Sequence, residues 1–174
     1  MLKDSGVGID NVSVGAGIKI CDHIKWQPKW TIEKYDKDMK LYETEEIDGN
    51  LLLNEGIGEL LNLLIGGTAT AFSNANAFIG VGDGTTAAAA TQTGLVGSNK
   101  TYVKMDTGYP QIVGNVVTFS ATFGASVGNH AWREFTVANS NSDTGKNLNR
   151  KVESALRTKV SPDTWVIRLQ ITIS

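Results

Sequence analysis

The chain has 174 residues, and its 16 Lys and Arg nearly balance its 18 Asp and Glu, which argues against a strongly basic nucleic-acid binder. It is 41% hydrophobic and 20% charged, which is apolar enough to bury a core and excludes a fully disordered chain. At roughly 100–200 residues per domain, we expect one domain, with or without an arm. The 19 glycines and the many Thr, Asn and Ala residues suit a turn-rich β protein better than a helical bundle.

The sequence does not favour a metal site, an intrachain disulfide or a membrane-spanning segment. Cys21 is the only cysteine, so no intrachain disulfide can form. His23 lies beside it without a second Cys or His nearby, whereas a structural metal site needs about four ligands. No stretch reaches the roughly 18–20 apolar residues of a membrane span, and the first residues lack the apolar core of a secretory signal. We therefore expect no metal, no cofactor and no membrane partner, with synthesis and folding in a reducing cytoplasm.

The first 48 residues are expected to form an N-terminal arm. Four glycines interrupt its first 24 residues, which give only short apolar alternations, at Val12, Val14, Ile18 and Ile20. Such a segment cannot bury enough apolar area alone to offset its ordering entropy, so it either orders against something else or does not order. The alternation in residues 29–35 and 39–44, around the polar turn at 36–38, predicts a β-hairpin.

Aromatic side chains in this hairpin are candidate contacts. Trp26 and Trp30 stand on either side of Pro28 in a highly charged stretch. They either pack onto the chain's own core, which is the more frequent case, or anchor a partner. With Tyr35 and Tyr42 of the same hairpin, we take them as candidate partner-interface residues.

Charge is unevenly distributed, and residues 84–99 carry none. A small protein surface normally carries interspersed charge for solubility. The neutral segment is therefore either a contact with a neighbouring subunit, which we favour, or a flexible loop. Its candidate interface residues are Thr85, Thr86, Thr91 and Leu95.

Residues 54–65 are predicted to form a single helix. Asn54 is a suitable N-cap, and the paired glycines at 66–67 end the helix. Gly56 and Gly58 each weaken its first turns by about 1 kcal/mol relative to Ala. Because its propensity is low, we expect the helix to be stabilised by docking its apolar face, made of Ile57, Leu60, Leu61 and Leu64.

After the helix the hydrophobic pattern changes to a period of two. Alternation is cleanest in residues 116–123 and in the last strand, where Trp165, Ile167, Leu169, Ile171 and Ile173 are expected to face inward. Shorter strands are expected at 77–81, 101–105, 132–137 and 148–159. Seven or eight short strands separated by Gly, Asn and Ser turns predict a mainly β chain, with a β-sandwich or jelly-roll-like domain over residues 49–174.

The sequence offers no recognisable catalytic motif. Residues 80–85 (GVGDGT) lack the lysine of a phosphate-binding loop, and we interpret them as a tight turn. An enzyme would need a site assembled from distant residues such as His130, Glu134 and Asp83, so we expect no enzyme. The basic residues near the C-terminus are interpreted as a solvated edge strand, ahead of a contact with an acidic partner or nucleic acid; they are Lys146, Arg150, Lys151, Arg157 and Lys159.

An ordered series of short motifs over residues 30–174 resembles a group of tailed-phage virion proteins. The motifs are EKYDKD at 33–38, GNLL at 49–52, NEG at 54–56, IGVGDGTT at 79–86, NVVTFSATF at 115–123, EF at 134–135 and the terminal strand 165–174. Met39 stands where other members often carry a glycine. The similar proteins are small β-rich capsid cement (decoration) proteins and fibre or baseplate accessories.

This resemblance implies a capsid cement protein that binds and stabilises the major capsid protein lattice on the phage head, as a homotrimer and without nucleic acid. Symmetric assembly would give the neutral segment 84–99 a place to be buried. The alternative is a tail, fibre or baseplate accessory protein with a glycan-binding surface, for which the candidate aromatic residues are Tyr102, Tyr109 and Trp132.

Overall fold

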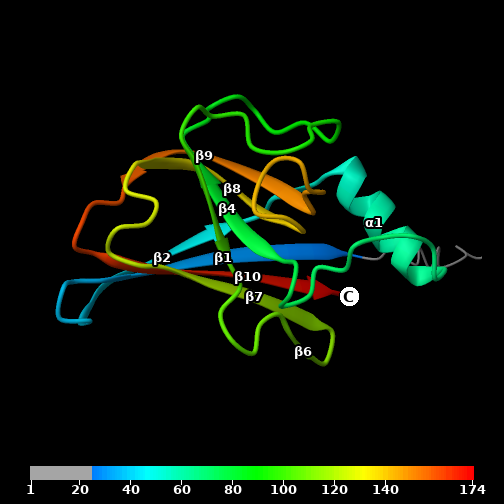
Figure 1. The fold of residues 1–174 in the computed structure, drawn as a ribbon, viewed down its shortest axis with the longest axis horizontal. Helices are drawn as coiled ribbons and strands as arrows, with labels where there is room; N and C mark the ends of the chain where they lie inside the picture. Colours follow the sequence, from blue (N-terminus) through cyan, green and yellow to red (C-terminus); the bar gives the residue numbers. More distant parts are fainter. Residues whose placement is uncertain (1–24) are drawn as a thin grey trace, which may run out of the picture.

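Two five-stranded antiparallel sheets pack face to face in the computed structural model, which describes residues 25–174 (Figure 1). The first sheet has the order β2 (Leu41–Asp48), β1 (Trp26–Tyr35), β10 (Thr164–Ile173), β7 (Val116–Phe123) and β6 (Gln111–Val113). The second has the order β3 (Leu51–Leu52), β9 (Asn149–Thr158), β8 (Ala131–Ala138), β4 (Phe78–Gly82) and β5 (Lys100–Lys104). The prediction of a mainly β sandwich with one short helix is confirmed. The segment expected at residues 1–24 lies outside the described residues.

The predicted hairpin exists, but it belongs to the sandwich and not to an arm. β1 lies between β2 and β10 and pairs with β10 at ten positions, from Trp26 opposite Ile173 to Tyr35 opposite Thr164. Residue 48 is therefore not a domain boundary in this fold. The hairpin turn places Met39 at φ 58°, in the left-handed region that favours glycine.

Lys34 is a charged residue at an inward position of β1. Its position continues the inward alternation of Trp30 and Ile32, yet a lysine there favours an exposed strand. In the structure its stem is buried and its Nζ lies 4.7 Å from the centre of the Trp165 ring, where it also pairs with Glu43 and Glu45. Aliphatic burial with a paired ammonium group makes a core position compatible with lysine.

Aromatic residues organise the space between the sheets. The Trp132 ring meets those of Phe123 and Trp165 edge-on, with ring centroids 4.9 and 4.7 Å apart. Trp30 packs against Phe135 at 5.7 Å. The inward face predicted for the last strand is buried as far as Ile171, whereas Ile173, at its end, is partly exposed.

The helix α1 spans Asn54–Leu64, close to its predicted bounds, but it docks differently from the prediction. Leu53 occupies the N-cap position without a side-chain cap bond, so the Asn54 cap was wrong. The buried residue of α1 is Gly56, which lies so close to the Leu148 backbone that a Cβ would clash with its carbonyl oxygen. The predicted apolar face remains largely exposed. Within residues 25–174 no helix has the length and apolarity needed to cross a membrane.

The last strand can be tested with one substitution. Leu169 is fully buried, so Leu169→Ala should lower the free energy of unfolding by about 2–5 kcal/mol, measured by chemical denaturation. The control is Val113→Ala on β6, where 76% of the residue is exposed and the change should stay within about 0.5 kcal/mol. Equal effects of the two substitutions would contradict the assignment of inner and outer faces.

Candidate interaction surface

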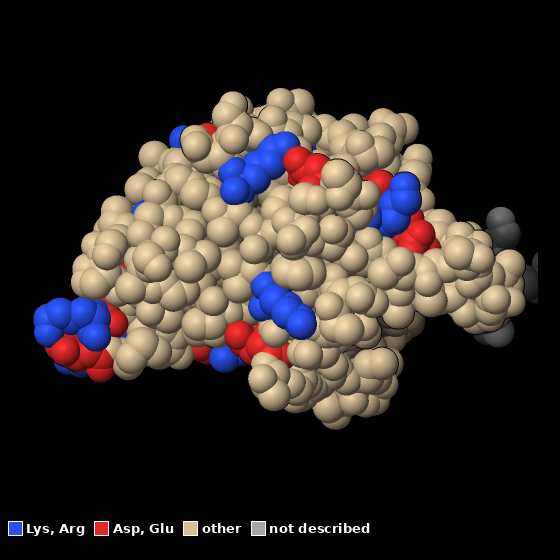
Figure 2. Space-filling model, viewed as in Figure 1, with Lys and Arg blue, Asp and Glu red and all other residues tan. Residues whose placement is uncertain are grey.

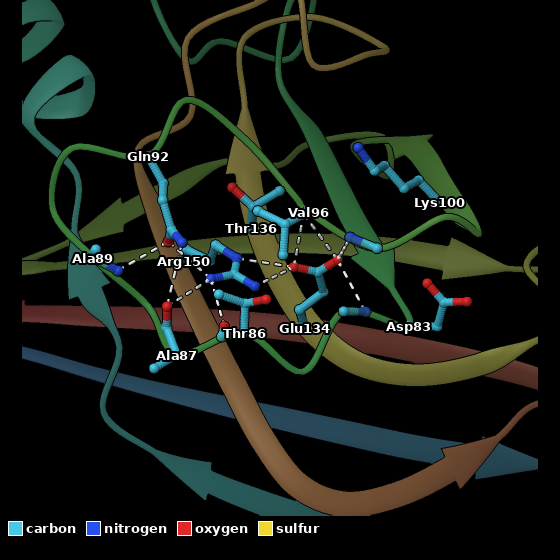
Figure 3. A network of polar contacts seen from close by, with 12 residues as sticks. Asp83, Thr86, Ala87, Ala89, Gln92, Val96, Lys100, Glu134, Thr136 and Arg150 are labelled. Atoms are coloured by element: carbon cyan, nitrogen blue, oxygen red, sulfur yellow. Dashed lines mark hydrogen bonds and ion pairs between the residues drawn. The ribbon is translucent and has the colours of Figure 1, made fainter.

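The neutral segment lies in the long loop between β4 and β5, residues 83–99, which crosses the outer face of the second sheet over β8 and β9 (Figures 1 and 3). Its outward side chains are small and uncharged: Thr85, Thr86, Ala87, Ala89, Thr91, Thr93 and Val96 are exposed. On the molecular face in Figure 2, charged groups are confined to a few small clusters. We call residues 84–99 the neutral loop.

A buried ion pair lies beneath the neutral loop (Figure 3). Glu134 comes from β8 and Arg150 from β9, and neither side chain has any exposed area. Arg150 Nη2 and Nε lie 2.6 and 2.8 Å from the same carboxylate oxygen, Glu134 Oε2. These are charge-assisted hydrogen bonds, which are roughly twice as strong as neutral ones.

Each member of the ion pair also binds the loop backbone. Glu134 Oε1 accepts hydrogen bonds from the amides of Gly84, at 3.2 Å, and Gly97, at 2.7 Å. Arg150 Nη1 donates to the Thr86 carbonyl oxygen at 3.0 Å and to Gln92 Oε1 at 2.8 Å. The ion pair therefore fixes the loop at both ends and at its middle.

Glycines around the carboxylate make this approach possible. A Cβ at Gly82 or Gly84 would lie 2.5 Å from Glu134 Oε1, and one at Gly97 would lie 2.8 Å from it. The glycine-rich stretch 80–85 was interpreted from sequence as a tight turn. In the structure it leads from the end of β4 into the loop, and its glycines leave room for the carboxylate of Glu134. Its glycines serve close packing, as glycine does wherever backbone must approach another group.

Asp83 closes the base of the loop. Its Oδ1 accepts from the Asn99 amide at 3.1 Å and its Oδ2 from Asn99 Nδ2 at 2.6 Å. Desolvation alone would raise the pKa of Asp83, but the hydrogen bonds from Asn99 and from neighbouring backbone amides outweigh it, so the pKa lies below its usual range. The ionised carboxylate is the form that accepts both hydrogen bonds from Asn99.

The candidate interface residues fall into separate places. Thr85, Thr86 and Thr91 are exposed together on the neutral loop, whereas Leu95 of the same loop is buried beneath it, so its assignment to a partner contact is wrong. The threonines remain candidates for contact with a partner.

The hairpin candidates lie apart from the loop. Trp30 is fully buried in the core, so its assignment to a partner contact is also wrong. Trp26 is half-buried and donates its Nε1–H to Asn50 Oδ1 at 3.1 Å. Tyr35 and Tyr42 donate to Glu33 and Asp163, each at 2.7 Å, and Tyr42 remains exposed.

The basic residues do not form one solvated edge. Arg150 and Lys159 are fully buried, which corrects that interpretation for both. Lys159 Nζ donates to the Gly124 carbonyl oxygen at 2.8 Å and to Asn129 Oδ1 at 2.9 Å, and burial lowers its pKa. Sequence reasoning missed the pair of Arg150 with Glu134, since an outward charge on a strand normally indicates solvent.

The residues named for other site types are also placed. Of the residues named for a possible enzyme site, Asp83 and Glu134 both lie close to Gly97, but Glu134 forms its ion pair with Arg150. His130 forms hydrogen bonds with the Thr101 hydroxyl and the Ala131 carbonyl oxygen. Of the aromatic glycan candidates, Trp132 is fully buried, which contradicts a role in surface binding. Tyr102 and Tyr109 are half-buried, and burial together with a hydrogen bond to Asp143 raises the pKa of Tyr102.

Residues 25–174 contain no cluster of three or more His, Cys, Asp or Glu side chains arranged to hold a metal ion. Cys21 and His23 lie outside these residues. No family model, no curated protein and no solved structure matches the chain.

Loss of the Glu134 charge should be strongly destabilising. Glu134→Gln leaves a buried guanidinium without its counter-charge, and we expect a loss of about 3–5 kcal/mol in the free energy of unfolding by chemical denaturation. The matched control is Asp38→Asn, which breaks the exposed Lys37–Asp38 pair and should cost no more than about 1 kcal/mol. A loss below 1 kcal/mol in Glu134→Gln would show that the pair does not anchor the loop.

Asp83 should make stability dependent on pH on the acid side. Because its folded pKa is lowered, its contribution is present above the ordinary carboxyl pKa of about 4 and is lost as the pH falls through the folded value. Asp83→Asn should therefore lower the thermal midpoint at pH 7, with a difference from the wild type that shrinks between pH 5 and pH 3. A difference that stays constant over this range would refute the role of the ionised carboxylate.

Proposed function

We propose that the chain is a structural protein of a tailed-phage virion, a capsid cement protein that binds the major capsid protein on the head surface as a homotrimer. Two lines of support converge. One is the resemblance of the motif series in residues 30–174 to this group of proteins. The other is the anchored neutral loop, which is the observation that carries the proposal.

The neutral loop has the properties of a protein-binding surface. The centres of protein interfaces are depleted of charged residues, and Thr85, Thr86 and Thr91 present small uncharged groups there. Binding also costs less when the surface is ordered beforehand, because no loop entropy is lost on association. The bonds from Glu134 and Arg150 supply this order within the isolated chain.

The homotrimer is what the resemblance implies, and the neutral loop gives it a surface for the subunit contact. Contacts around a symmetry axis are closed, so an uncharged patch on each subunit can be buried without leaving an open chain of contacts. We place the neutral loop at this subunit contact, and the capsid-facing surface on other parts of the molecule. A trimer would attach through three equivalent sites, and this multivalency strengthens weak individual contacts.

The copy number per particle tests the assignment to the head. Quantitative mass spectrometry of purified virions should find hundreds of copies relative to the major capsid protein. About a dozen copies or fewer would instead favour the alternative, a tail, fibre or baseplate accessory. Absence from virions would contradict both assignments.

Charge placed on the neutral loop should disrupt assembly without unfolding the chain. Thr85→Lys combined with Thr91→Lys should weaken trimer formation at least about tenfold, equal to about 1.4 kcal/mol, measured by analytical ultracentrifugation. Lysines from three copies would repel each other and lose solvation at the contact.

The control is Thr158→Lys, a change of the same type at an exposed position at the end of β9, and it should leave the trimer intact. Thermal midpoints of both variants should stay near that of the wild type. An unchanged trimer in the loop variant, or equal disruption in both, would contradict the placement of the neutral loop at the subunit contact.

A further inference from the structure

An apolar groove opens between α1 and the end of the first sheet at which β1 and β7 begin and β10 ends. It has a volume of about 440 Å³, and none of the residues that line it is charged. Leu60 and Leu63 of α1 form one wall, and Ile112, Val117 and Ile171 contribute from β6, β7 and β10. We call it the α1 groove.

Exposed apolar side chains line the groove and extend beyond it. Ile112, in the groove, is 77% exposed, and Leu64 and Ile65, beyond it at the end of α1, are each 79% exposed. Large adjoining apolar patches on a protein surface mark sites that are covered by something else. Nothing among residues 25–174 covers this one, although the amphipathic spacing of α1 favours a buried face.

The N-terminal segment enters the described fold at the rim of this groove. Lys25 exchanges backbone hydrogen bonds with Ser174, at 2.6 and 3.2 Å. The next residue, Trp26, pairs with Ile173, and both line the α1 groove. The 24 preceding residues are therefore attached directly beside the exposed apolar surface.

The sequence of that segment matches the groove in polarity. Residues 11–18 (NVSVGAGI) carry no charge and contain three of the four apolar residues that alternate in this region. Within residues 11–20, Lys19 is the one charged residue, and in an extended chain it points to the face opposite Ile18 and Ile20. From residue 18 to Lys25 the chain can span up to about 23 Å at roughly 3.3 Å per residue, so it is long enough to turn back over the groove. Attachment to the rim also gives the segment a high effective concentration there.

We propose that residues 12–20 dock in the α1 groove of their own chain, with Val12, Val14, Ile18 and Ile20 covering the exposed leucines of α1. Docking would cover the apolar residues that line the groove and would bury the apolar side chains of the segment. This proposal does not depend on the assignment to a virion, since it concerns a contact within one chain.

Cross-linking of the full-length chain tests the contact. In a Cys21→Ser background, Val14→Cys is combined with Leu63→Cys in the groove, and a short homobifunctional thiol reagent is added to dilute protein. The control combines Val14→Cys with Val160→Cys, an exposed position before the start of β10 and thus at the opposite end of that strand from Ile173. We expect an intramolecular cross-link in the groove pair and only background in the control.

The other outcomes overturn the proposal. Cross-linked dimers from the groove pair would mean that the groove receives the segment of a second copy. Equal cross-linking in both pairs would mean that the segment has no preferred site. No cross-link in either pair would leave the groove to a different partner.

A dye that fluoresces on apolar surfaces gives an independent readout. Val14→Asp should expose the groove and increase the fluorescence, whereas Ser13→Asp, which adds the same charge at the neighbouring residue, should not. Circular dichroism of both variants checks that the sandwich is intact. An equal increase for both substitutions, or no increase for either, would contradict docking through the apolar side chains.

Discussion

The buried pair of Glu134 and Arg150 is the interaction on which the outer surface of the second sheet depends. Burying two charges costs desolvation energy, and such a pair contributes little net stability even when its geometry is good. Its main effect here is on conformation, because the same two side chains hold the backbone of the neutral loop at several points. An uncharged segment without regular secondary structure, whose main buried side chain is Leu95, is thereby kept in one arrangement.

Several features of the sequence serve this arrangement. Gly82, Gly84 and Gly97 leave room for the carboxylate, and Gln92 accepts from Arg150 while donating to the Ala87 carbonyl oxygen. The loop in turn shields the ion pair from water, which strengthens its electrostatic attraction. The neutral loop, the glycines and the ion pair therefore depend on one another. The surface that we assign to assembly is held in place by residues of the sandwich itself.

The sequence predicted the strands and the helix well, because periodicity follows directly from which face is buried. It failed where one residue departs from its usual environment. β1 lies in a highly charged stretch, which favoured an arm over an inner strand, and Gly56, not the leucines of α1, makes the closest contact with the sandwich. Glu134 and Arg150 could not be paired from sequence, because outward positions of an antiparallel sheet normally face solvent and the loop that covers them has no periodic pattern.

Hydrogen exchange at the amides of Val96 and Gly97 tests the central claim most directly. Both donate to the Glu134 carboxylate, although they lie in a surface loop without regular secondary structure. If the ion pair orders the neutral loop, these amides should be protected to about the same degree as those of β8, and Glu134→Gln should remove this protection before the strands open. Exchange in the wild type as fast as in an unstructured peptide would show that the loop is not held, and would contradict the account.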